Sequence, residues 1–156
     1  MKRLLYGLVA LAFVACDNNE TEIYKGGSTY AFKQSEIVVN ASETDSFRLE
    51  VYYIEEPETD LARNLFSFHV DEERSTPDWK EYFEIAPYTV QMEETEDGTF
   101  FSYINIKADK VKEDNKEVVV YLNTFGRRDS SLTGFDGKEP IYDIVIRLQP
   151  TSPVID

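Results

Sequence analysis

The stretch FRLEVYY, from Phe47 to Tyr53, decides the fold class of this chain. Phenylalanine, leucine, valine and tyrosine recur in it at every second position, and an arginine and a glutamate stand between the first three. Side chains alternate between the two faces of a β-strand, so this spacing predicts a strand with one buried and one solvent-facing side. A strand of this kind needs a second sheet or a helix to cover its apolar face.

The same period of two recurs along the rest of the chain. Strands are predicted over 29–32, 36–39, 47–53, 66–70, 88–93, 104–107, 118–122 and 143–148. Turn residues separate them, and Glu93 to Gly98 is predicted to be a hairpin tip in which Gly98 takes a positive φ. Pro77 to Tyr82 predicts one short helical turn. Seven or eight short strands predict an all-β fold, an antiparallel immunoglobulin-like β-sandwich.

The first 15 residues have the layout of a secretory signal. Lys2 and Arg3 form a basic head, and an uncharged apolar run then extends to Ala15. The run is shorter than the roughly 20 residues that a membrane-spanning helix needs. We therefore expect a cleaved signal peptide. A buried N-terminal helix is the alternative, but the run has no amphipathic stripe to support it.

Cys16, the only cysteine, follows this run directly. One thiol cannot form an intramolecular disulfide, and a free thiol is a liability in an oxidising compartment. The stretch Phe13-Val14-Ala15-Cys16 resembles the box of bacterial lipoproteins, in which the cysteine is acylated and becomes the first residue of the mature protein. The family prefers leucine where Phe13 stands. The resemblance implies that Cys16 carries acyl chains, and two or more such chains anchor a protein stably to a membrane.

The residues after Cys16, DNNETE, contain three acids and no core-forming side chain, which is typical of a solvated tether. An acidic stretch at this place resembles the surface-export signal of Bacteroidetes lipoproteins. It implies a lipid-anchored outer-membrane protein that is exposed at the cell surface; an anchor facing the periplasm is the alternative. The expected organisation is a signal peptide (1–15), a lipidated tether (16–27), the β-sandwich (28–150) and a C-terminal tail (151–156).

The composition restricts the class of partner. The chain has 30 Asp and Glu against 16 Lys and Arg, and its formal net charge is −14. This acidity argues against nucleic acid or an anionic lipid surface as a docking partner.

The residues from about 70 to 150 resemble Calx-beta domains. The acid-tyrosine pair Glu81-Tyr82 precedes a short predicted strand, and a strand, an acidic turn and an alternating strand follow in the family's order. Some Calx-beta domains bind calcium, which takes six to eight oxygen ligands. Lys116 stands where the family usually has an acid, and the family's acidic cluster after the last strand is missing. The calcium ligands that the resemblance implies are Glu81, Asp109 and Glu113; otherwise these acids solvate loops.

Catalytic motifs are weak in this sequence. His69 is the only histidine and lies on the polar side of its predicted strand. A Ser-His-Asp triad would have to use it, and no nucleophile-elbow sequence is present. A hydrolase with two paired carboxylates is a further alternative, but any pair is unremarkable among 30 acids. We therefore expect no catalytic residues.

The stretch from Asn123 to Lys138 is long for a connection between strands, and long connections often carry function. It contains two phenylalanines beside glycines and a pair of adjacent arginines, a mixture that can contact sugar, peptide or a partner protein. Alternatively, its phenylalanines fold back over the end of the sandwich. The only tryptophan either stacks on sugar or closes the core. The candidate ligand-binding residues are Phe125, Arg127, Arg128, Phe135 and Trp79.

These observations predict a non-catalytic cell-envelope lipoprotein, a binding or structural accessory at the outer surface that captures glycan or protein. The glycan expectation rests on analogy with what such lipoproteins often bind. A calcium-binding module is the alternative, and no other cofactor is implied.

Overall fold

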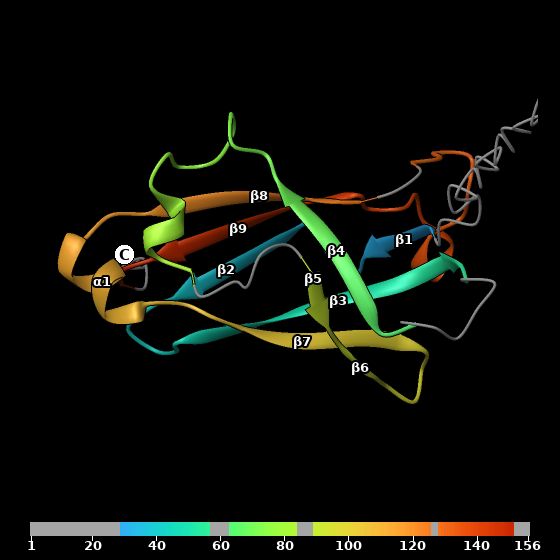
Figure 1. Cartoon of the computed structure of the whole chain (residues 1–156), viewed down its shortest axis with the longest axis horizontal. Helices are drawn as coiled ribbons and strands as arrows, with labels where there is room; N and C mark the ends of the chain where they lie inside the picture. Colours follow the sequence, from blue (N-terminus) through green and yellow to red (C-terminus); the bar gives the residue numbers. More distant parts are fainter. Residues whose placement is uncertain (1–28, 57–62, 84–88, 126–127, 152–156) are drawn as a thin grey trace, which may run out of the picture.

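The computed structural model describes residues 29–56, 63–83, 89–125 and 128–151. Within them, nine strands form a four-stranded and a five-stranded sheet that face each other (Figure 1). The predicted all-β sandwich is confirmed, with nine strands in place of seven or eight. None of the helices in this described part is long and apolar enough to cross a bilayer.

The elements follow one another along the chain as strands with three short helical segments. They are β1 (Thr29–Phe32), β2 (Glu36–Asn40), β3 (Ser46–Glu55), β4 (Leu65–Val70), η1 (Trp79–Glu81), β5 (Thr89–Gln91), β6 (Glu93–Glu94), β7 (Thr99–Asn105), α1 (Ala108–Asp114), β8 (Val118–Thr124), η2 (Phe135–Gly137) and β9 (Asp143–Gln149).

The strand order matches the immunoglobulin arrangement. One sheet has the order β1-β3-β7-β6 and the other the order β2-β9-β8-β4-β5. Across the first sheet, β1, β3, β7 and β6 occupy the positions A, B, E and D of the immunoglobulin fold. In the second sheet, β4, β8 and β9 occupy the positions C, F and G. The end of β3, the start of β4, the end of β8 and the start of β9 therefore lie at the same end of the sandwich as the start of β1 (Figure 1).

One strand pair departs from the predicted antiparallel arrangement, because β2 runs parallel to β9. The chain leaves β1 at Phe32 and enters β2, in the opposite sheet, at Glu36. The link between Phe32 and Glu36 is too short to reverse the chain, so β2 continues in the direction of β1 and runs parallel to β9. The bond from the Val145 N–H to the Ser35 carbonyl, 3.0 Å, fixes β2 beside β9.

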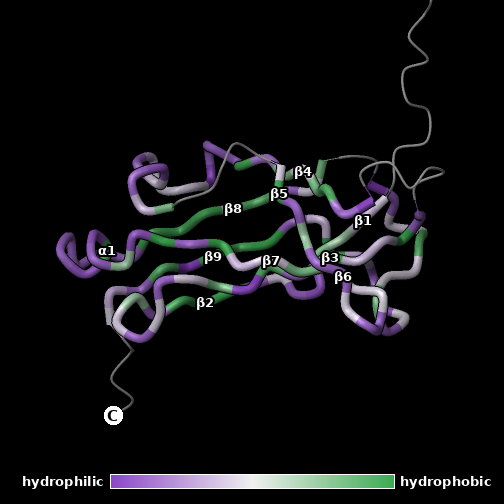
Figure 2. Tube along the Cα trace, turned by 60° about the horizontal axis from the view of Figure 1, so that its bottom comes forward, coloured by the Kyte–Doolittle hydropathy of each residue, from purple (hydrophilic) through white to green (hydrophobic). Residues whose placement is uncertain are grey.

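Alternating side chains build the core, as the sequence predicts. On β8 and β9 the inward residues are buried, and hydrophobic segments of the trace follow β8 and β2 (Figure 2). The largest aromatic cluster is centred on Phe66 of β4, which is 0% exposed. Its ring centroid lies 5.1 Å from each of the rings of Tyr30, Tyr53 and Phe100, so that side chains from both sheets meet there.

Two predicted boundaries are wrong. The strand predicted over 88–93 is divided at Met92 into β5 and β6, which belong to different sheets. The strand predicted over 104–107 begins earlier, at Thr99, and the acidic turn expected after it is the helix α1. Val111 is the buried residue of this helix, and Asn115 ends it with a left-handed φ of 46°.

The two predicted local turns are confirmed. Trp79–Glu81 forms a 3₁₀ turn inside the stretch predicted to be helical. Gly98 has a φ of 77° at the tip between the paired strands β6 and β7. Several predictions lie outside the described residues: the signal peptide, Cys16, the acidic tether, Arg127 and the tail beyond residue 151.

Candidate functional site

A shallow depression lies on the outer face of the five-stranded sheet, where the second half of β4 lies beside the end of β8. We call it the β4–β8 pocket. It is lined by His69, Asp71, Asn123, Thr124, Phe125 and Arg128.

The sheet register brings the polar residues of this pocket together. His69 on β4 is the direct partner of Asn123 on β8, and Asn123 is in turn the partner of Asp143 on β9. Side chains that lie directly opposite one another in antiparallel strands share a face of the sheet. Their neighbours Phe68 and Ile144 are buried in the core, so His69, Asn123 and Asp143 form a polar row on the outer face.

Asn123 has an unsatisfied hydrogen-bond acceptor. The residue is only 7% exposed, and its Oδ1 atom has no hydrogen-bond partner among the described residues. Its amide nitrogen lies 3.5 Å from Nε2 of His69. A buried acceptor without a partner costs about 1–3 kcal/mol, so native proteins seldom retain one without a reason. Because this oxygen is itself inaccessible, a donor in the pocket reaches it once the Asn123 side chain turns outward.

Phe125 supplies an apolar surface beside this oxygen. It is 67% exposed, which is unusual for a phenylalanine. Its backbone is nevertheless fixed, because its N–H donates to the Ser67 carbonyl at 3.1 Å and to the Tyr30 hydroxyl at 3.3 Å. The ring therefore stands on a well-anchored backbone position at the edge of the pocket.

The charges that border the pocket are paired. Arg128 makes a bidentate contact with Asp143, with distances of 2.6 and 3.2 Å. Asp71 accepts a bond of 3.2 Å from the backbone N–H of Arg74, and the two side chains form an ion pair at 3.8 Å. The Arg74 guanidinium in turn lies 4.0 Å from the centre of the Tyr121 ring. Both charged residues that line the pocket, Asp71 and Arg128, thus have a partner of opposite sign.

The structure unites some of the predicted ligand-binding residues and separates others. Phe125 and Arg128 line the pocket together. Phe135 lies 5.4 Å from the Tyr52 ring, with Lys33 5.0 Å above it, and so folds back on the other sheet. Trp79 is buried at the opposite end, where its Nε1 donates to Glu72 at 2.8 Å.

Four residues of the pocket, His69, Asp71, Asn123 and Thr124, are not among the predicted ligand-binding residues. The sequence predicts a connection that starts at Asn123, but the structure places Asn123 and Thr124 in β8, and the connection begins at Phe125. The sequence predicts His69 on the polar side of its strand, and the residue is exposed there. His69 and Asn123 could have been found only from their pairing across β4 and β8, which joins residues 54 positions apart in the sequence.

At the opposite end of the sandwich, lysines contact the acids that the Calx-beta resemblance implies. Glu81 pairs with Lys110 at 3.2 Å, and Asp109 with Lys112 at 2.6 Å. Glu113 is exposed on α1. Among the described residues, no three His, Cys, Asp or Glu side chains are grouped closely enough to hold a metal ion. An ammonium group thus neutralises each of the two paired candidates.

Lys116, which stands where the family has an acid, also neutralises a carboxylate at this end of the sandwich. Its Nζ lies 2.5 Å from the Asp78 carboxylate and 4.9 Å from the centre of the Tyr82 ring. The Tyr82 hydroxyl also donates to Asp114 at 2.5 Å. These contacts join η1 to α1. The Lys116 ammonium holds the pKa of Asp78 below its usual value.

This pair makes the stability of the sandwich depend on pH. The unfolded carboxyl binds a proton more readily than the folded one, so the contribution of the pair is present above about pH 4 and is lost as the pH falls toward the lowered folded-state pKa. We expect Lys116→Gln to lower the melting temperature by a few degrees at neutral pH and to have a smaller effect at ~pH 2. Melting curves at both pH values, with the exposed Lys138→Gln as control, test this. An equal deficit at both pH values would contradict it.

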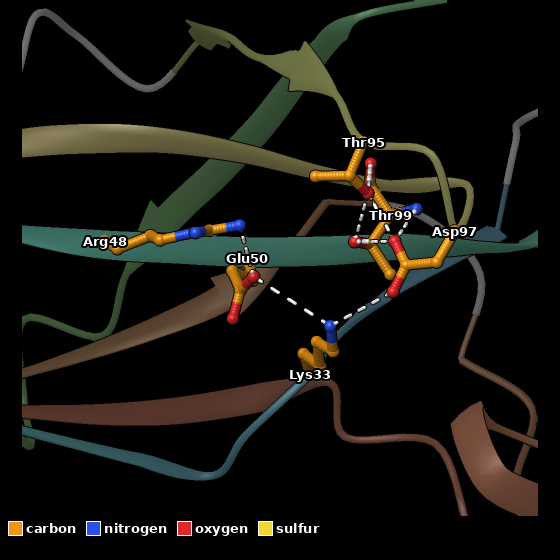
Figure 3. Close-up of polar contacts among 6 residues, drawn as sticks. All are labelled: Lys33, Arg48, Glu50, Thr95, Asp97 and Thr99. Atoms are coloured by element: carbon orange, nitrogen blue, oxygen red, sulfur yellow. Dashed lines mark hydrogen bonds and ion pairs between the residues drawn. The ribbon is translucent and has the colours of Figure 1, made fainter.

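A third polar cluster supports the β6–β7 hairpin and the outer face of the four-stranded sheet (Figure 3). Asp97 accepts bonds from the hydroxyls of Thr95 and Thr99 and from the Thr99 N–H, and these bonds lower its pKa far below the usual value. Lys33 lies 3.6 Å from Asp97 and 3.9 Å from Glu50. Because the members of this cluster bind one another, we assign it to hairpin stability.

No family model, curated protein or solved structure matches the chain.

Proposed function

We propose that this chain is a lipid-anchored protein of the outer cell surface that captures an extracellular ligand in the β4–β8 pocket, without catalysing a reaction. The observation that carries the binding role is the exposed ring of Phe125 beside the unpaired, buried oxygen of Asn123. The anchoring role is supported by the signal-like residues 1–15, by Cys16 and by the acidic stretch that follows it.

The surroundings of His69 favour binding over catalysis. A triad would need a hydroxyl nucleophile and a carboxylate to orient the imidazole. The Ser67 hydroxyl lies 3.1 Å from the Thr89 hydroxyl, and Asp71 contacts Arg74. The groups nearest to His69 in the sequence are therefore engaged elsewhere, whereas its cross-strand neighbour is the Asn123 amide.

Phe125→Ala is expected to weaken ligand binding at least about tenfold, because an exposed aromatic anchor commonly contributes more than about 1.4 kcal/mol to an interface. The fold should be unaffected, since the ring is 67% exposed. Arrays of glycans and peptides identify a ligand, and calorimetric titration then compares the variants.

Tyr103→Ala is the matched control. Tyr103 is also an exposed aromatic, 62% exposed, but it lies on β7 in the other sheet. Its removal should leave the affinity unchanged. If Phe125→Ala binds as tightly as the wild type, the ligand does not use the pocket, and the proposal fails.

A further inference from the structure

We infer that the β4–β8 pocket takes an uncharged saccharide, whose hydroxyl donates to Oδ1 of Asn123 and whose ring lies against Phe125. This inference rests on the proposed function, because it names the ligand class of the same pocket. Three features of the pocket carry it: the type of atom that lacks a partner, the pairing of β4 with β8 beneath the pocket, and the balance of charge.

The unpaired atom determines what the ligand must donate. An amide oxygen only accepts hydrogen bonds, so the ligand must present an O–H or N–H group. An apolar ligand would leave Asn123 unsatisfied and would add to its desolvation penalty. The exposed Phe125 ring beside it favours a ligand that also has an apolar face. A pyranose has both, since its hydroxyls project around a ring that carries C–H groups on its faces.

The sheet order argues against an extended peptide. Peptides commonly bind β-domains by adding a strand to an exposed sheet edge. The pocket lies over the seam between β4 and β8, where Phe68–Val70 pair with Leu122–Thr124, whereas β5 pairs only with Leu65–Ser67. Along this seam the two strands pair with each other, so the floor of the pocket offers no ladder for a peptide backbone. Recognition has to come from side chains, which suits a small ring with several hydroxyls.

The charge balance argues against acidic sugars. Arg128 is neutralised by the bidentate contact with Asp143, and Asp71 by Arg74. The local ion pairs therefore supply no excess positive charge to attract a carboxylate or sulfate. The whole chain has a formal net charge of −14, which repels anions over distances comparable to the Debye length. Binding of a neutral saccharide should accordingly depend little on salt.

The test uses purified full-length protein in detergent and three sets of probes. These are neutral gluco-, manno-, xylo- and galacto-oligosaccharides, oligogalacturonates, and short unstructured peptides. The variants are Asn123→Leu, which removes the acceptor at similar volume, and Phe125→Ala, with Tyr103→Ala as control. Melting temperature is measured for each variant beside affinity.

The expected result separates recognition from stability. Asn123→Leu should bind a neutral oligosaccharide at least about tenfold more weakly, yet melt at the same or a higher temperature, because it removes an unsatisfied buried group. Phe125→Ala should also lose affinity, and Tyr103→Ala should not.

Two other results would overturn the inference in different ways. If an oligogalacturonate or a peptide binds and both pocket variants abolish that binding, the ligand class is wrong, but the pocket remains the binding site. If no probe binds, or if binding survives both Asn123→Leu and Phe125→Ala, the ligand class and the proposed function both fail.

Discussion

Phe66→Ala is expected to destabilise the sandwich by about 3–5 kcal/mol, the range for removing a buried phenylalanine from a core. Phe66 is 0% exposed, and its ring meets three other aromatic rings at centroid distances of 5.1 Å. Those rings come from β1, β3 and β7, so a cavity at Phe66 would weaken the contact between the two sheets. Urea unfolding at neutral pH measures the change in the free energy of unfolding.

The neighbouring residue on the same strand provides the control. Leu65 lies on the opposite side of β4 and is 44% exposed, so Leu65→Ala should change the stability by less than about 0.5 kcal/mol. A large loss for both variants would indicate that the alternation does not determine burial on β4. A small loss for both would show that the aromatic cluster does not hold the sheets together.

Cys16→Ala is expected to abolish membrane association, because the acyl chains are the only anchor that we propose. The wild type should sediment with membranes from a Gram-negative host and should be digested when protease is added to intact cells. The variant should stay in the soluble fraction. Since Cys16 is the only cysteine, its replacement changes no other thiol. If the two proteins fractionate alike, Cys16 is not lipidated.

The acidic stretch permits a separate test of orientation. Replacing Asp17, Glu20 and Glu22 by their amides removes its charge while leaving Cys16 in place. We expect this variant to remain membrane-bound but to resist protease in intact cells, because the export signal is lost. Full digestion of the variant would show that the acids do not direct the protein to the surface.

Local pattern was sufficient to predict most of the fold. The alternation on β3, β4, β8 and β9 follows directly from which side chains face the core, and the positive φ of Gly98 follows from the turn it occupies. The parallel pairing of β2 with β9 was not predictable in this way, because it joins residues more than 100 positions apart, such as Glu36 and Val145. The helix α1 was also missed, since its seven residues are too few for a helical period to be visible.

The candidate site was predicted only in part, for the same reason. Phe125 and Arg128 were identified because arginine and aromatic residues on a long connection form a local signal. Asn123 gave no such signal, because its importance comes from burial and from the residue opposite it on β4. Phe135 gave the same signal as Phe125 but packs on Tyr52. Composition identifies candidates, and only the register determines which of them meet.

The most direct test of the central claim, that the β4–β8 pocket is the binding site, is to map a bound ligand by amide chemical shifts. The protein is labelled with ¹⁵N and titrated with the neutral oligosaccharides. The account predicts that the largest shifts fall on residues of the pocket, at His69, Asn123 and Phe125, and that the amides around Tyr103 remain unchanged. Shifts confined to the opposite sheet, or no shifts with any of the oligosaccharides, would contradict it.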